Sequence, residues 1–390
     1  MKKILFCLAS ICMFISCQNE LYKDPLDKKY DSAQGAFING QGTIQVFVEE
    51  GVEVPVNDVV IGLVKPSESE TNVLIKAGDS EQLERFNAKN HTEYQILPEE
   101  MYSVSDNVNF ESKVTSQKLN VTLKNVKFTA GINYALPVRI SGGDVNGVPG
   151  EMEALIVLEQ RIRTKCLKMN GSGTESNTMW PEGIRFGQWT FEAMVKRSAY
   201  SENNQSIGGT KTLANTEPRD EIFTRFGDVT IDPNQLQIKT GASQIDVDKE
   251  KFAAKPDEWY MLTFVYDGKK HYVYVNGEQV AEAEIRDGEY NATGFWIGGR
   301  NEYIREYRFW KVARTPKQIK EFVWKMVDYT DTDLLCYYPC NGKKLNEDGT
   351  IVEDETKVWD WSTYRHHLNN PPSSFYDDND GDMFVFPLQK

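Results

Sequence analysis

The chain has 390 residues and carries 58 acidic against 44 basic side chains, a net charge of −14 at neutral pH. An acidic surface repels phosphate backbones and the sequence contains no basic stripe, so nucleic acid is excluded as an expected partner. At about 150 residues per domain, the length predicts two or three folded domains. Aromatic residues make up 12% of the sequence, and we expect most of them in cores and some on stacking surfaces.

The first residues have the pattern of an export signal. Lys2 and Lys3 precede an apolar run of about a dozen residues, whereas a membrane-spanning helix needs about 20. Ser16 and Cys17 resemble the lipobox of bacterial lipoproteins, in which the cysteine is lipidated. The resemblance implies a signal peptide over residues 1–16, a lipid anchor on Cys17 and an outer-membrane lipoprotein exposed at the cell surface. An ordinary signal that happens to contain a cysteine is the alternative. We interpret the polar residues 17–34 as a tether.

Residues 35–160 predict an N-terminal β-sandwich of immunoglobulin-like size. Apolar residues alternate or cluster as in strands, and Gly, Asn and Asp turns separate them; the expected strands cover residues 42–48, 55–64, 118–123, 134–140 and 154–159, with one helix at 80–88. The segment 128–138 resembles the uncharacterised N-terminal domain of polysaccharide-utilisation lipoproteins of the gut type. The resemblance implies a spacer or docking module that precedes a glycosidase or lectin-like domain.

A short charged junction at residues 161–165 leads to a second β-rich domain over residues 165–390. Strands are expected at 189–196, 259–266, 271–275 and 279–284, and Asn276 with Gly277 forms a strong hairpin signal. One helix is expected at 315–324, because Thr315 is a suitable N-cap and Pro316 is favoured at the first helical position.

The order of these motifs closely resembles the laminin-G-like, concanavalin A-like jelly roll. The matching residues are Trp259, Tyr266 to Gly268, Tyr274 to Gly277, Ile297 to Gly299, Phe309 with Trp310, and Thr315 with Pro316. The sequence therefore predicts an all-β chain, an immunoglobulin-like sandwich followed by this jelly roll with one short helix. A fold of this kind does not by itself settle a function.

Catalysis is not expected, although hydrolases share the jelly roll. Those glycosidases carry a Glu-x-Asp-x-Glu pattern, whose alternation puts the carboxylates on one face of a strand. The nearest match here runs from Gln244 through Asp246 to Asp248. Its first position is an amide, which cannot act as the nucleophile. A carbohydrate-active hydrolase therefore stays an alternative, which an acidic groove around Asp246 and Asp248 would favour.

Calcium binding is left open. Lectin-like jelly rolls often bind calcium through loop carboxylates, and Asp378, Asp380 and Asp382 are the candidate ligands. Arg305 stands where the family has an acid near its metal, which argues against a site there. A solvated acidic turn is the alternative for residues 377–382.

Three cysteines belong to the expected folded part, Cys166, Cys336 and Cys340. Four residues apart on one strand, Cys336 and Cys340 would lie about 13 Å from each other, too far for a disulfide. A bond from Cys166 to one of them and three free buried thiols both remain open.

Loop aromatics are the best clue to a ligand, because indole and phenol rings stack on the flat C–H faces of sugars while polar neighbours bind the hydroxyls. Each of these residues has a purely structural role as its alternative, and the tryptophans within strand patterns, Trp296 among them, are assigned to the core. The candidate carbohydrate-binding residues are Trp180, Tyr200, Tyr290, Arg300, Asn301, Tyr303 and Trp361.

Together the lipobox and the jelly roll imply a cell-surface lipoprotein that captures an oligo- or polysaccharide for a glycan-utilisation system. Its partners would be the glycan, the membrane through the lipid anchor, and an outer-membrane transporter complex. A structural or protein-binding surface lipoprotein is the first alternative, and the hydrolase is the second.

Overall fold

The computed structural model describes residues 34–39, 42–176, 179–212, 220–241, 243–371 and 373–388. The predicted signal peptide, Cys17 and nearly all of the tether lie outside these residues. The chain divides into two compact units: the first holds the described residues up to Val46 with Glu53–Lys124 and Ala135–Val157, and the second holds Phe47–Val52, Asn125–Tyr134 and the chain from Leu158 onwards. Within the described residues, no helix has the length and apolar character needed to cross a bilayer.

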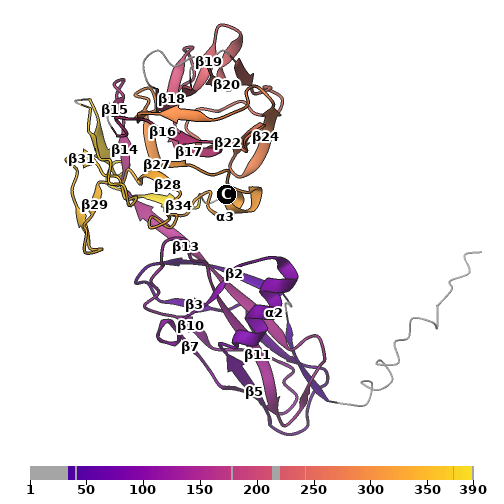
Figure 1. The fold of residues 1–390 in the computed structure, drawn as a ribbon. Coiled ribbons are helices and arrows are strands. Elements are labelled where there is room, and N and C mark those ends of the chain that lie inside the picture. The colour runs from indigo at the N-terminus through magenta and orange to yellow at the C-terminus, as the bar shows by residue number, and fades with distance from the viewer. Residues whose placement is uncertain are drawn as a thin grey trace, which may run out of the picture. The chain divides into compact units, whose positions relative to one another are not determined.

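The first unit is built mainly on antiparallel strands (Figure 1). Its largest sheet has the order β2 (Gly42–Glu49), β13 (Glu153–Thr164), β11 (Tyr134–Gly143), β5 (Thr71–Ala77) and β8 (Asn107–Phe110), and β6 (Gln95–Ile96) also pairs with β11. A second sheet contains β12 (Asn146–Gly147), β1 (Gly35–Asn39), β4 (Val60–Leu63) and β9 (Ser116–Lys118), and in it β1 and β12 pair in parallel. A third contains β3 (Val54–Val56), β10 (Val121–Leu123) and β7 (Tyr102–Val104).

The single strand expected over residues 55–64 is wrong, because β3 and β4 are separate strands in different sheets. Asn57 and Asp58 fall in the break between them, as their low strand propensity would favour. The expected helix is confirmed as α2 (Ser80–Asn90). The Asp79 side chain caps its N-terminus by accepting from the N–H groups of Glu81 and Gln82, and a 3-10 turn follows at Glu99–Met101.

The second unit contains two large sheets (Figure 1). The larger has the order β24 (Glu278–Ala283), β23 (His271–Val275), β22 (Trp259–Tyr266), β17 (Trp189–Lys196), β27 (Tyr303–Trp310), β14 (Cys166–Lys168) and β33 (Phe375–Asp377), with β28 (Leu334–Tyr338) paired to β27. The six-stranded sheet has the order β15 (Thr174–Ser176), β26 (Gly294–Ile297), β18 (Gln205–Lys211), β19 (Ile222–Asp228), β20 (Ile231–Thr240) and β21 (Ser243–Asp246).

Short strand pairs complete the second unit. They are β16 (Ile184–Phe186) with β25 (Tyr290–Ala292), β29 (Lys343–Leu345) with β30 (Ile351–Glu353), and β31 (Lys357–Val358) with β32 (Leu368–Asn369). Residues 161–164 of the expected charged junction form the last part of β13. Within this part, Ile162 to Thr164 pair with β34 (Phe384–Phe386).

Side chains from both large sheets form one apolar core. Phe191, Leu262 and Phe309 come from the larger sheet, and Phe226 and Leu236 come from the six-stranded one; all five are fully buried. This arrangement follows from period-two alternation, which sends every second side chain of a strand to the same face. The all-β prediction is confirmed.

Local signals place the hairpin and the helix of the second unit. Asn276 and Gly277 both adopt positive φ, 49° and 84°, as a two-residue turn between β23 and β24 requires. The helix α3 (Pro316–Glu321) begins after Thr315, whose side chain accepts from Gln318 in a capping box. It ends before the predicted residue 324, because Phe322 already leaves the helical conformation.

All three described cysteines are free and buried, which settles the alternative left open by the sequence. Burial raises the pKa of the Cys166 thiol to about 12. Burial also raises the thiol pKa values of Cys336 and Cys340 well above the usual range. These groups are protonated and shielded at neutral pH, so they are packing residues rather than nucleophiles.

A buried charge network lies on the larger sheet. Arg308 donates from Nη2 to Glu306 Oε2 at 2.6 Å and from Nη1 to Glu192 Oε2 at 3.4 Å. The Nε1 of Trp310 also donates to Glu192, at 2.9 Å. Burial opposes ionisation of Glu306, but the charges of Arg305 and Arg308 outweigh it and lower the pKa of this carboxyl. Opposite charges and hydrogen bonds thus compensate for desolvation.

Candidate functional site

The six-stranded sheet presents one face to the core and the other face away from it. Ile222, Phe226, Leu236 and Ile238 point into the core. Residues directly opposite each other in antiparallel strands share a face, so the strand register defines a row on the second face. That row crosses the whole sheet and contains Glu175, Trp296, Gly209, Phe223, Lys239 and Gln244. We call this surface the outer face.

Two aromatic rings form the centre of the outer face. Trp296 and Phe223 are half-buried, and their ring centroids lie 5.2 Å apart at an interplanar angle of 45°. The indole Nε1 donates to the carbonyl oxygen of Thr210 at 3.2 Å, which fixes the ring orientation. Gly209 lies between the two residues in the row, and it leaves room for the rings to meet.

A polar network borders the aromatic pair on the side of β19, β20 and β21. Arg225 donates from Nε to Gln237 Oε1 at 2.6 Å and from Nη1 to Asn204 Oδ1 at 2.7 Å, and it forms an ion pair with Asp228. The Gln237 amide nitrogen donates to Asp246 Oδ1 at 2.6 Å and to Asp228 Oδ2 at 3.2 Å. The side chains therefore hold one another in fixed positions on the outer face.

The ionisation of Asp228 follows from this network. Partial burial raises its pKa, but hydrogen bonds from the Val229 backbone and Gln237, together with the charge of Arg225, outweigh that effect. The net result is a pKa below the ordinary range, so Asp228 is a carboxylate at neutral pH. It can accept hydrogen bonds there but cannot donate a proton.

A groove of about 300 Å³ lies beside Trp296. Its lining includes Glu175, Ser206, Arg300 and the backbone of Gly298 and Gly299. Two ion pairs stand at or near its border: Lys211 lies 2.7 Å from Glu175, and Arg300 lies 3.3 Å from Glu202. These pairs are solvent-exposed, so they contribute little to stability and remain open to further hydrogen bonds.

The outer face thus combines a fixed aromatic surface with charged and amide groups that both donate and accept. An aromatic ring offers a large apolar contact area. Charge-assisted hydrogen bonds from arginine and carboxylate are stronger than neutral ones. A ligand that fits this surface has one flat apolar face and several hydroxyl groups around its edge.

Of the residues predicted from sequence, only Arg300 lines this groove. Trp180 is half-buried against the main core. The centroids of its ring and the His366 ring lie 5.5 Å apart in a T-shaped arrangement. Tyr200 is also half-buried, with its ring 5.0 Å from Phe226. Burial raises the pKa of the Tyr200 hydroxyl to about 12. Both rings therefore serve packing in this structure.

The predictions for four other residues are wrong, because these side chains are buried and cannot stack on a ligand. Tyr290 is fully buried and its hydroxyl bonds to His271 at 2.8 Å. Asn301 is equally buried and accepts from Arg197 Nε at 2.9 Å. Tyr303 donates to Asp377 at 2.8 Å, and Trp361 donates to the Lys343 carbonyl at 3.1 Å.

Trp296 is the residue that the sequence reasoning missed. Its position within a strand pattern predicts a core residue, and that prediction is wrong because the side chain is half-buried on the outer face. The usable signal in the sequence is that Phe295 and Trp296 are adjacent in one strand, and the structure buries Phe295. Adjacent residues of a strand point to opposite faces, so Phe295 and Trp296 could not both enter the core.

The acidic residues 378–382 lie in a turn at the surface of the second unit. Within the described residues, no group of three or more His, Cys, Asp and Glu side chains could hold a metal ion. The Asp378 carboxylate accepts from the Gly381 backbone at 3.0 Å. Asp380 stands in a left-handed conformation at φ 61° and Asp382 is exposed. Of the two alternatives left open by the sequence, the geometry of Asp378, Asp380 and Asp382 is that of the solvated acidic turn.

The two carboxylates of the hydrolase-like motif have different surroundings. Asp246 lies on the outer face, where it shares the Gln237 amide with Asp228. Asp248 lies after the end of β21 and accepts from the Glu250 backbone at 2.9 Å, as in a turn. The second acid near Asp246 is thus Asp228 and not Asp248.

Two family matches cover separate parts of the chain. Residues 29–147 match a family of N-terminal domains, and residues 172–320 match the family described as the concanavalin A-like lectin/glucanases superfamily. The second unit is a concanavalin A-like jelly roll. The predicted resemblance is confirmed, and the description of this superfamily covers both lectins and glucanases. No curated protein sequence matches the chain.

A solved structure shares the fold of this chain. A Bacteroides ovatus protein described as a candidate carbohydrate-binding protein is 22% identical, and the match covers 90% of this chain and 97% of that chain with a TM-score of 0.59. A heptameric pentraxin from Limulus polyphemus is 14% identical over 49% of this chain and 92% of its own, with a TM-score of 0.33. The likeness to the Bacteroides ovatus protein shows a common fold. The TM-score of the pentraxin match is too low to support an argument.

Proposed function

We propose that this protein binds carbohydrate on the outer face of its concanavalin A-like jelly roll. The observation that carries the proposal is the aromatic pair of Trp296 and Phe223, bordered by the network of Arg225, Gln237 and Asp246. The likeness to a candidate carbohydrate-binding protein and to a superfamily that includes lectins supports the same conclusion.

Binding is a reversible equilibrium between free and bound glycan, and the bound state combines stacking with hydrogen bonding. A sugar ring places its C–H face on Trp296, and its hydroxyls exchange water for the polar groups at the border of the ring. Because Thr210 holds the indole and Arg225 holds Gln237, little side-chain freedom is lost on binding. Each site is expected to bind weakly, since the groove is open and small.

The cellular role that we propose is capture at the cell surface. Lipidation of Cys17 would tether many copies to the outer membrane, and tethering raises the effective concentration of binding sites. Captured oligosaccharide would then pass to an outer-membrane transporter complex of a glycan-utilisation system. The lipobox at Ser16 and Cys17 supports this part of the proposal.

A hydrolase is the second candidate, because Asp228 and Asp246 flank one amide group on the same face. A glycosidase needs one carboxyl group that is protonated at working pH. The lowered pKa of Asp228 opposes that role. Binding without turnover is therefore the function that the site supports best.

The test is a glycan-array screen of the protein from residue 18 onwards, which retains every described residue. The screen is run with calcium and with chelator, and each glycan that binds is incubated with the protein and checked for cleavage products. Binding without products is the expected result. Products would establish the hydrolase, and silence across plant, host and microbial glycans would favour a structural or protein-binding role.

A further inference from the structure

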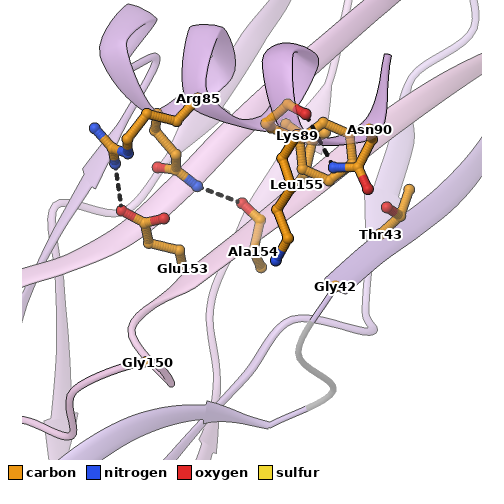
Figure 2. A pocket seen from close by; sticks show the side chains of 11 residues that line it. Gly42, Thr43, Arg85, Lys89, Asn90, Gly150, Glu153, Ala154 and Leu155 are labelled. Carbon is orange, nitrogen blue, oxygen red and sulfur yellow. Dashed lines mark hydrogen bonds and ion pairs between the residues drawn. The ribbon is translucent and has the colours of Figure 1, made fainter. Parts of the chain in front are cut away.

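The first unit contains a pocket of about 620 Å³ between the helix α2 and the strands β2 and β13 (Figure 2). Leu83 and Phe86 of the helix pack near Leu155 of β13. The amide nitrogen of Gln82 donates to the Ala154 carbonyl at 3.0 Å and to the Val138 carbonyl at 3.4 Å. The helix is therefore held on the sheet, and the pocket walls have fixed positions.

Gly42 and Gly150 line the pocket where it is open. A Cβ atom added at Gly42 or Gly150 would meet no atom within 4 Å. Phe86 and Leu155 supply apolar parts of the lining, and Thr43 and Asn90 supply a hydroxyl and an amide. A volume of this size falls in the range of about 300–1,000 Å³ that small-molecule sites occupy.

Charged groups give the pocket a positive balance. Arg85 and Glu153 form an ion pair at 2.7 Å, and Figure 2 shows this pair at one side of the pocket. Lys89 extends from the helix toward the strands in the same view. Within the described part of the chain, Lys89 has no ion-pair or hydrogen-bond partner. Although the chain as a whole is acidic, the Lys89 ammonium is a local positive charge at this pocket that can pair with an anionic group.

We propose that this pocket binds an acidic saccharide, whose carboxylate pairs with Lys89. The sugar ring would contact the half-buried Phe86, and its hydroxyls would bond to Thr43, Asn90 and the exposed edges of the Arg85–Glu153 pair. The chain would then carry a second saccharide site, in addition to the one proposed on the jelly roll. The first unit would be a recognition module rather than a spacer.

The test uses ligand-observed NMR and calorimetry on the protein from residue 18 onwards carrying Trp296→Ala, which removes the ring of the other proposed site. The probes are galacturonate oligomers, N-acetylneuraminate and neutral galactose oligomers. We expect one of the two acidic probes to bind and the neutral probe to bind at least about tenfold more weakly. Raising the salt from about 0.05 to 0.5 M should weaken the acidic probe further.

The matched variants are Lys89→Gln and Lys118→Gln, since Lys118 is an exposed lysine of the same unit outside the pocket. Lys89→Gln should weaken binding of the acidic probe about tenfold or more, and Lys118→Gln should leave it unchanged. Equal binding by the two variants, equal binding of the neutral probe, or no binding of either acidic probe would overturn the proposal. These results are independent of glycan binding at Trp296. That binding is measured separately, with the protein that keeps Trp296.

Discussion

Trp296 and Phe223 pack against each other across Gly209, with ring centroids 5.2 Å apart on a face of the sheet that is turned away from the core. Three strands contribute one residue each to this contact. The position between the rings has to lack a side chain, because a Cβ atom at Gly209 would lie 2.9 Å from Cζ2 of Trp296 and 1.9 Å from the Ile222 carbonyl oxygen.

The substitution Gly209→Ala should therefore disturb both the sheet and the aromatic pair. Forcing an extra carbon into a packed site costs about 1–3 kcal/mol. We expect a loss of that size in the free energy of unfolding, measured by chemical denaturation, together with weaker glycan binding. Gly187→Ala is the control, since a Cβ atom there meets nothing within 4 Å. Wild-type stability in Gly209→Ala would contradict the packing described for this residue.

Local patterns were sufficient to predict much of the fold. The strands β17, β22 and β23 match their predicted bounds, and the Asn276–Gly277 turn and the Thr315 cap formed as their residue types require. These features depend on neighbours in the sequence. The break between β3 and β4 was missed because both segments are apolar enough for one strand.

The site was much harder to predict, because exposure depends on residues that are distant in the sequence. Trp180 lies in a polar loop, yet His366 covers its ring. Tyr290 follows a turn, yet it packs between Trp189 and Phe186. Nothing local to either residue reports these contacts. For Trp296 the alternation with Phe295 was available in the sequence, and it shows that only one of these two aromatics can face the core.

The buried pairs around Arg308 predict a large effect of a single substitution. Arg308→Met should lower the free energy of unfolding by about 3–5 kcal/mol, because Glu192 and Glu306 would keep buried charges without this partner. Chemical denaturation at pH 7 measures the change. Lys320→Met removes an exposed pair with Glu278 and should cost no more than about 1 kcal/mol. Similar losses in both variants would contradict the role assigned to burial.

His271 should make stability depend on pH. Burial and then the charge of Arg286 lower its pKa to about 4, from 6.5 in the unfolded chain. As pH falls from 6.5 toward 4, the unfolded chain binds a proton that the folded protein refuses, so stability falls through this window. Between pH 7 and 5, His271 alone lowers the free energy of unfolding by about 2 kcal/mol.

The variant His271→Gln tests this pH dependence, since glutamine does not titrate. Its stability, measured by chemical denaturation at both pH values, should fall by about 2 kcal/mol less than that of the wild type. His367, whose pKa burial also lowers to about 4, remains in both proteins and contributes equally. An identical pH dependence of the two proteins would show that His271 accepts a proton in the folded state.

The three described cysteines should not react in the native protein. Their thiols are buried and their pKa values are raised, so thiolate is scarce and inaccessible. A colorimetric thiol assay on the protein from residue 18 onwards should detect no fast-reacting group, and three groups after denaturation without reductant. Fewer than three would reveal a disulfide, and rapid labelling before denaturation would reveal an exposed thiol.

The central claim is that the protein binds glycan through Trp296, and calorimetric titration of three proteins tests it most directly. Wild type, Trp296→Ala and Tyr364→Ala are titrated with the glycan identified on the array; Tyr364 is an exposed aromatic outside the outer face, with 38% of its surface accessible. We predict that Trp296→Ala weakens binding about tenfold or more while all three proteins stay folded at the temperature of the titration, as circular dichroism reports, and that Tyr364→Ala binds like the wild type. Unchanged affinity in Trp296→Ala would contradict the account.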